Sequence, residues 1–165
     1  MKLLKLLSCL AASALLAAAQ DHRSLCLFFD LNVSAPDQLR AQEAAIKFVE
    51  DRLTPSDQVT IMTFTTEVKV VQDFTGDRDL LVASLRKIAP SSPSTAATSD
   101  SVSLQGLQTA ATILGATPGR KQLVYFSKPD SRPFADNQDQ LKATIDAAVH
   151  ASVAFYSVNV QDPPR

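Results

Sequence analysis

Glycine is scarce in this chain of 165 residues, which contains four, and the first of them is Gly76. A G-x-G-x-x-G dinucleotide fingerprint and a phosphate-binding P-loop both place glycines directly after the first strand of their folds. With no glycine there, the sequence excludes both of these nucleotide-binding classes. An excess of charge of one sign is also missing, because 16 basic side chains are matched by 17 acidic ones. We therefore expect no basic surface large enough to bind nucleic acid.

Cysteine is rarer still, with Cys9 and Cys26 as the two in the chain. Residues 1–19 combine two lysines with an apolar run and end in three alanines, which is the pattern of a cleaved secretory signal peptide. We predict cleavage near Ala19, a secreted or periplasmic location, and a single domain over residues 20–165. Cleavage removes Cys9, so we expect Cys26 to be a small buried side chain without a disulfide partner.

The remainder of the chain alternates between short apolar runs, typical of buried strands, and amphipathic stretches, typical of helices. The predicted strands are 24–30, 59–64, 68–74, 122–126 and 153–160, and the predicted helices are 36–53, 78–88, 101–114 and 137–151. The short connection between the second and third strands predicts an antiparallel hairpin. The helical connections instead require parallel neighbours. The predicted fold class is therefore α/β and Rossmann-like, with a mostly parallel central sheet, one antiparallel edge strand and helices on both faces.

The last predicted helix carries an apolar stripe. Its members are Leu141, Ile145, Ala148 and Val149. Because the apolar stripe of a surface helix normally packs on the core, we expect these four side chains to face the sheet.

Ligands of parallel α/β sheets bind beyond the carboxyl ends of the strands, where successive loops converge. The loops in that position are 30–35, 90–100 and 127–133. The first reads Asp30-Leu31-Asn32-Val33-Ser34, with an oxygen-bearing side chain at every second position. Three such oxygens can bind a hard cation such as Mg²⁺. Alternatively, Asp30 and Ser34 use the same oxygens to cap the helix that follows.

The first loop also resembles the D-x-S-x-S metal loop of von Willebrand factor type A domains. Further stretches are similar to one branch of exported proteins, the VWFA-related Acidobacterial domain family. These stretches are 53–57, 62–64, 71–79, 123–127, 136–138 and 153–156. The resemblance extends from Leu25 to about Asp162 and identifies the chain as a short member of this family.

The resemblance implies that a metal ion sits at the strand ends and completes its coordination with an acidic residue of a protein partner. The implied metal residues are Asp30, Asn32 and Ser34. This chain departs from the family pattern in three loops, with Asn32 in place of a serine, an unassigned threonine position (Thr95, Thr98 or Ser99), and Lys128 in place of an aspartate. An ammonium group close to a divalent ion is strongly unfavourable. We therefore expect Mg²⁺ binding to be weak or lost, and Lys128 to contact Asp30 instead.

The sequence thus favours an exported, non-enzymatic protein-binding module with a degenerate metal-dependent adhesion site and no small-molecule substrate. The partner-binding residues that the resemblance implies are Asn32, Ser34, Thr95, Thr98, Ser127, Lys128 and Asp130. The resemblance also implies that the last strand and helix of the family are missing. Their absence would leave an edge strand and an apolar face uncovered, which predicts self-association, a partner or marginal stability.

The alternative is a haloacid dehalogenase-like phosphatase or phosphotransferase. In that class Asp30 would act as the nucleophile, supported by Ser127 and Lys128. Asn32 weighs against this alternative, because it stands where those enzymes need the acid that protonates the leaving group.

Overall fold

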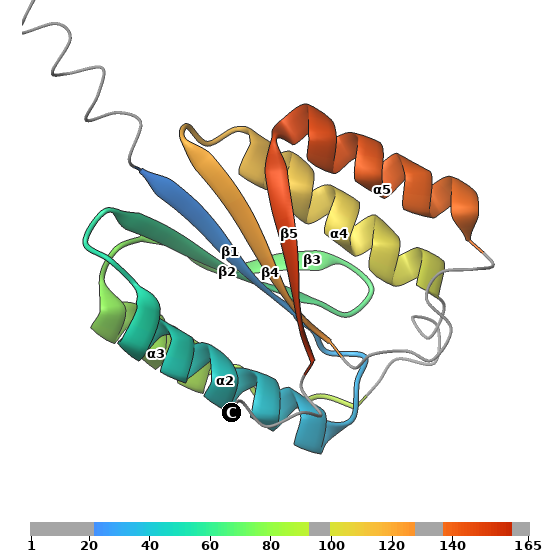
Figure 1. Cartoon of the computed structure of the whole chain (residues 1–165). Helices are drawn as coiled ribbons and strands as arrows, with labels where there is room; N and C mark the ends of the chain where they lie inside the picture. The colour runs from blue at the N-terminus through green and yellow to red at the C-terminus, as the bar shows by residue number, and fades with distance from the viewer. Residues whose placement is uncertain (1–21, 93–99, 128–136, 160–165) are drawn as a thin grey trace, which may run out of the picture.

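The computed structural model describes residues 22–92, 100–127 and 137–159. Strands and helices are interspersed along the chain (Figure 1). Their order is β1 (Arg23–Asp30), α2 (Ala35–Arg52), β2 (Asp57–Phe64), β3 (Val68–Thr75), α3 (Arg78–Arg86), α4 (Asp100–Gly115), β4 (Arg120–Ser127), α5 (Gln138–Ala151) and β5 (Val153–Asn159). Residues 1–21, which contain the predicted signal peptide, lie outside the described part, so that prediction stays open.

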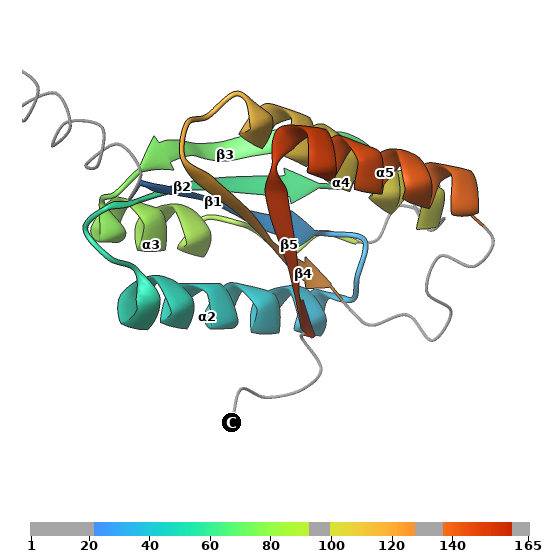
Figure 2. The ribbon, with the colours of Figure 1, turned by 45° about the horizontal axis from the view of Figure 1, so that its top comes forward.

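The five strands form one sheet in the order β3-β2-β1-β4-β5. β1 is parallel to both β2 and β4, and β4 is parallel to β5. β3 pairs antiparallel with β2 at one edge. Helices α2 and α3 cover one face, whereas α4 and α5 cover the other (Figure 2). The predicted fold class, including the single antiparallel edge strand, is confirmed.

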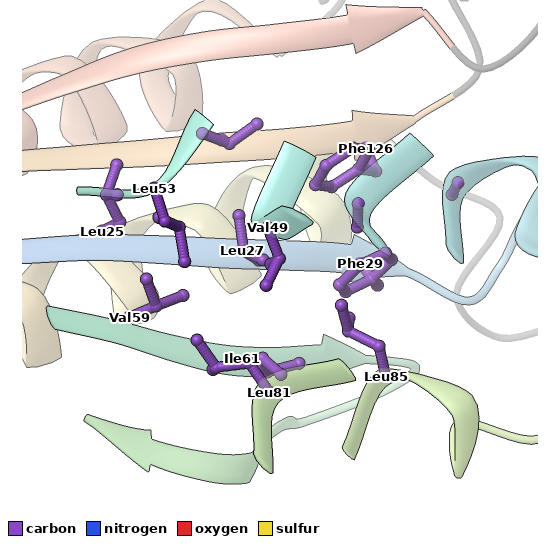
Figure 3. Packing of buried hydrophobic residues seen from close by; sticks show 13 residues of the cluster. Leu25, Leu27, Phe29, Val49, Leu53, Val59, Ile61, Leu81, Leu85 and Phe126 are labelled. Carbon is purple, nitrogen blue, oxygen red and sulfur yellow. The ribbon is translucent and has the colours of Figure 1, made fainter. Parts of the chain in front are cut away.

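The central strand β1 divides the core into two layers. Its alternating residues Leu25, Leu27 and Phe29 pack against side chains of α2 and α3 (Figure 3). Cys26 and Phe28 point to the other face, toward the cluster that includes residues of α4. Both faces of β1 are buried because helices lie on each side of a parallel sheet.

Cys26 is fully buried, and burial raises the pKa of its thiol well above the ordinary value. A thiol in such a position is not a nucleophile at neutral pH. The prediction of a small core side chain is confirmed.

The predicted inward stripe of α5 is wrong in part. Ile145 is 52% exposed and Val149 is 70% exposed, whereas Thr144 and Ala148 are buried. The reason is that α5 packs closely on α4, where the hydroxyl of Thr144 donates a hydrogen bond to the carbonyl oxygen of Leu104 at 3.1 Å. Small side chains allow this close approach, and it leaves the two larger aliphatic side chains outside the core.

Helix α4 lies equally close to the sheet. A Cβ atom at Gly106 would come within 2.8 Å of the Phe64 ring on β2, so the glycine is what permits the contact. One turn before Gly106, Ser103 is thereby held over the carboxyl ends of the central strands, where the predicted loops converge.

Candidate functional site

The carboxylate of Asp30 is the centre of the candidate site. It lies at the carboxyl end of β1 and is 7% exposed. Its Oδ1 accepts a hydrogen bond from the backbone N–H of Asn32 at 2.9 Å. Its Oδ2 accepts from the hydroxyl of Ser103 and from the phenol hydroxyl of Tyr125, each at 3.1 Å. Three donors from three elements of the chain therefore converge on one buried carboxylate.

The pleat of the sheet explains this convergence. Asp30 follows Phe28 by two residues, so both side chains point to the face covered by α4. On the neighbouring strand, Tyr125 lies beside Phe28, with their ring centroids 5.9 Å apart. The phenol is thus held by packing at its ring and reaches Asp30 with its hydroxyl.

Asn32 ties the first loop to the hairpin between β2 and β3. Its side-chain amide donates to the carbonyl oxygen of Thr65 at 2.8 Å. The N–H of Leu31 also donates to the carbonyl oxygen of Phe64 at 2.8 Å, which continues the β1–β2 pairing beyond the strand. The loop is consequently fixed to the end of the neighbouring strand.

Ser34 is the N-cap of α2, as the alternative interpretation of the loop predicted. Its Oγ accepts from the N–H of Asp37 at 3.4 Å and donates to Asp37 Oδ2 at 2.6 Å. Asp37 in turn forms an ion pair with Arg40 at 2.8 Å. The capping role predicted for Asp30 is wrong, because Asp30 bonds to the N–H of Asn32 within its own loop and not to the helix.

The side chain of Gln38 forms hydrogen bonds with the backbone of the first loop, although the sequence analysis did not single this residue out. This buried side chain lies within hydrogen-bond distance of the carbonyl oxygens of Leu31 and Val33, at 2.9 and 2.8 Å. It also bonds both backbone groups of Ser91, at 2.7 and 2.9 Å. One amide therefore joins the first loop to the segment after α3.

The structure brings Asp30 together with two residues that the sequence analysis missed, Ser103 and Tyr125. A signal for Tyr125 was present, since it lies two positions before Ser127 and hence on the same face of the strand. Ser103 had no comparable signal in the sequence, because a serine in the first turns of a helix usually faces solvent. Several predicted residues lie outside the described part, namely Thr95, Thr98, Ser99, Lys128 and Asp130, and the side chain of Ser127 is likewise not described. The predicted contact between Lys128 and Asp30 stays a prediction.

A divalent cation held by Asp30, Asn32 and Ser34 does not match the arrangement of these residues. Oxygen ligands must direct lone pairs at the ion. Here three donors bond to Asp30, and the hydroxyl of Ser34 donates to Asp37. Across residues 22–92, 100–127 and 137–159, no three His, Cys, Asp or Glu side chains lie together in a way that could bind a metal ion.

Comparisons with known proteins agree with the fold. Two structures of proximal thread matrix protein 1 from the mussel byssus are similar to this chain. The first has a TM-score of 0.61 at 13% identity, over 86% of this chain and 36% of the mussel chain. The second, described as having a zinc-occupied MIDAS motif, has a TM-score of 0.56 at 12% identity, over 85% of this chain and 38% of the mussel chain. The chain thus spans little more than a third of either mussel protein.

Another similar structure is that of three N-terminal domains of the type V pilus tip protein Mfa5 from Porphyromonas gingivalis. It has a TM-score of 0.48 at 17% identity, over 63% of this chain and 19% of that protein. No curated protein sequence matches the chain. Among the described helices, none is long and apolar enough to cross a membrane.

The match to a family model is the most direct comparison. The model of the von Willebrand factor type A domain matches residues 32–130, which is more than half of the chain and begins two residues after Asp30. The similar mussel structures support the same fold over most of this chain. The chain belongs to the von Willebrand factor type A domain family.

Proposed function

We propose that this chain is an exported, non-enzymatic type A domain that binds another protein through the loops at the carboxyl ends of its strands. The surface would be formed by Asn32, Ser34, Thr95, Thr98, Ser127, Lys128 and Asp130. We further propose that its adhesion site is degenerate, with Mg²⁺ contributing weakly or not at all. The observation that carries the proposal is the Asp30 carboxylate, which is buried and accepts three hydrogen bonds from the chain itself.

The energetic argument starts from the cost of burying a carboxylate. Such a group is tolerated only when it is paired or hydrogen-bonded. Hydrogen bonds to an ionised acceptor are about twice as strong as those between neutral groups. The N–H of Asn32 and the hydroxyls of Ser103 and Tyr125 supply this stabilisation in place of a cation. The loops are then held in position by hydrogen bonds, so a partner would meet a surface that is already organised.

The same hydrogen bonds weigh against the phosphatase alternative. A carboxylate nucleophile needs an oxygen that can reach the phosphorus atom, and both oxygens of Asp30 accept hydrogen bonds from inside the fold. The side chain of Asn32 is an amide and cannot protonate a leaving group. The comparisons give the phosphatase alternative no support.

The first test measures metal dependence. A ligand that binds only the native state stabilises it by RT ln(1 + [L]/Kd), so about 1 mM Mg²⁺ with an equal Kd adds about 0.4 kcal/mol. We expect Mg²⁺, Mn²⁺ and Ca²⁺ to raise the free energy of unfolding by less than this, as measured by urea denaturation with and without a chelator. We also expect no turnover of a generic phosphomonoester.

The variants for this test are Asp30→Asn and, as a matched control, Asp73→Asn, which changes an exposed carboxylate on β3. A metal-dependent stabilisation that Asp30→Asn abolishes and Asp73→Asn retains would overturn the degenerate site. Phosphomonoester turnover with the same dependence on Asp30 would establish the phosphatase instead.

A second test addresses the binding surface. The purified chain is immobilised in the presence of a chelator and exposed to the secreted proteins of its source. We expect the chain to capture a protein, and we expect Asn32→Arg to abolish this capture, because the large cationic side chain of arginine at the first loop would block the proposed binding surface. Val70→Arg, which changes an exposed residue of β3, is the control and should retain capture. Equal loss with both variants, or capture that requires Mg²⁺, contradicts the proposal.

A further inference from the structure

The segment that follows α3 is held in place by a side chain from α2. Pro90 has no backbone N–H, so it cannot donate the hydrogen bond that would prolong the helix. The hydroxyl of the next residue, Ser91, is buried and has no hydrogen-bond partner within the described part of the chain. Both backbone groups of Ser91 bond instead to the side chain of Gln38, 53 positions earlier in the sequence. Among the hydrogen bonds of the described residues, those to Gln38 are therefore the ones that hold Ser91.

Gln38 reaches two parts of the chain because of its place in α2. It lies four residues after the N-cap Ser34, and its backbone N–H donates to the carbonyl oxygen of Ser34 at 2.9 Å. Side chains of a helix tilt toward its N-terminus, so the amide extends back to the carbonyl oxygens of Leu31 and Val33 in the first loop. Helix α3 packs beside α2 on the same face of the sheet, which brings Ser91 to the same amide (Figure 2).

The hydrogen-bonding capacity of this amide is fully used. Its oxygen accepts from the N–H of Ser91, so its nitrogen faces the carbonyl oxygens of Leu31, Val33 and Ser91. Two N–H groups serve three acceptors, which requires one hydrogen to be shared. Gln38 is 5% exposed, and buried polar groups that lose their partners are costly. Because one planar amide bonds both segments, a displacement of either segment weakens the hydrogen bonds of the other.

We propose that Gln38 is the positioning residue of the partner-binding surface and that it couples the first two loops of this surface. The inference rests on the proposed function, because it gives Gln38 a role in the same surface. The first loop carries Asn32 and Ser34, and the chain after Ser91 leads to residues 95–98 of the second loop. A partner that orders the first loop therefore also stabilises the segment at Ser91, and by linkage the reverse holds.

The first experiment compares hydrogen exchange, measured by NMR, in the unaltered chain and in Gln38→Met, which keeps the length of the side chain but has no N–H donor. Exchange is expressed relative to the central amides of β1, which report global stability. We expect exchange at the N–H of Ser91 to rise at least about tenfold, equivalent to 1.4 kcal/mol, and exchange at the N–H of Asn32 to rise as well. Gln42→Met is the matched control, because the Gln42 amide donates to carbonyl oxygens at the end of α3. It should leave exchange at Asn32 unchanged.

The second experiment alters the segment instead of the amide. Ser91→Pro removes the N–H that donates to Gln38, and we expect exchange at Asn32 to rise in response. Ser91→Ala is the control, because it keeps this N–H and removes a hydroxyl that has no partner among the described residues. In the Gln38→Met background, Ser91→Pro should add nothing at Asn32. Such a double-mutant cycle separates the coupling from the cost of each single change.

Capture of a secreted protein by the immobilised chain connects the coupling to binding. We expect Gln38→Met to weaken this capture and Gln42→Met to retain it. Equal capture by both variants overturns the positioning role.

Exchange is measured without a partner, so an unaltered chain that captures no protein overturns the proposed function and leaves the coupling to be judged by exchange. The coupling is overturned if Gln38→Met leaves exchange at Asn32 unchanged. It is equally overturned if Ser91→Pro accelerates exchange at Asn32 to the same extent with and without the Gln38 amide.

Discussion

Arg23→Ala is expected to lower the free energy of unfolding by about 3 kcal/mol, the cost typical of leaving a buried charge without its partner. Arg23 begins β1. Its guanidinium donates two hydrogen bonds to the Asp57 carboxylate, from Nε to Oδ1 at 2.8 Å and from Nη2 to Oδ2 at 2.6 Å. Asp57 is 2% exposed, so its carboxylate depends on donors from the chain. Thr54 still donates to Asp57, through its N–H at 2.7 Å from Oδ2 and through its side chain.

The same pair makes stability depend on pH. Burial by itself would raise the pKa of Asp57, but the hydrogen bonds from Arg23 and Thr54 outweigh it and hold the pKa below its ordinary value. A lowered pKa in the folded state contributes stability above the unfolded pKa of about 3.9, and this contribution is lost as the pH falls through the folded value. The difference between the wild-type chain and Arg23→Ala should therefore be full at pH 7 and shrink below about pH 4.

Urea denaturation of both proteins from neutral to acid pH measures this difference. Lys69→Ala is the control, because its ion pair with Glu67 at 3.3 Å is exposed on both sides. Exposed pairs contribute about 0–1 kcal/mol, so this variant should differ little from the wild-type chain. A pH-independent cost for Arg23→Ala would show that the arginine stabilises the fold through packing and not through its charge.

The sequence predicted the fold because each element carries its own local signal. Buried parallel strands appear as continuous apolar runs, and the hairpin between β2 and β3 is short enough to identify from its length. The Arg23–Asp57 pair had no such signal, since its members lie 34 positions apart and meet only when β1 and β2 align in parallel. Register between strands is a property of the assembled sheet.

The candidate site likewise contains contacts that local sequence predicts and contacts that form only in the assembled fold. Ser34 as a helix cap follows from local spacing, because Asp37 lies three residues further on. Ser103 and Tyr125 reach Asp30 from 73 and 95 positions away, and only the packing of α4 and β4 around β1 brings them there. The exposure of Ile145 on α5 was missed for a related reason. Helical periodicity shows which residues share a stripe, but the neighbouring helix decides which stripe is buried.

Phe28→Ala should have an effect as large as that of Arg23→Ala or larger. Phe28 is 1% exposed and lies between the rings of Phe64 and Tyr125, with centroid distances of 6.1 and 5.9 Å. Replacing a buried phenylalanine by alanine removes its transfer free energy and leaves a cavity, at a cost of about 3–5 kcal/mol. Urea denaturation should show this loss, whereas Val71→Ala on the exposed face of β3 should cost far less.

The Phe28 variant also tests how the candidate site is held together. Tyr125 packs on Phe28 with its ring and donates to Asp30 with its hydroxyl, so a cavity at Phe28 frees the ring to move. We expect faster hydrogen exchange at the N–H of Asn32, which donates to the same carboxylate, beyond the acceleration at exposed amides of β3. If exchange at Asn32 rises only as much as global stability falls, the core does not position the site, and the first loop holds Asp30 through its own hydrogen bonds alone.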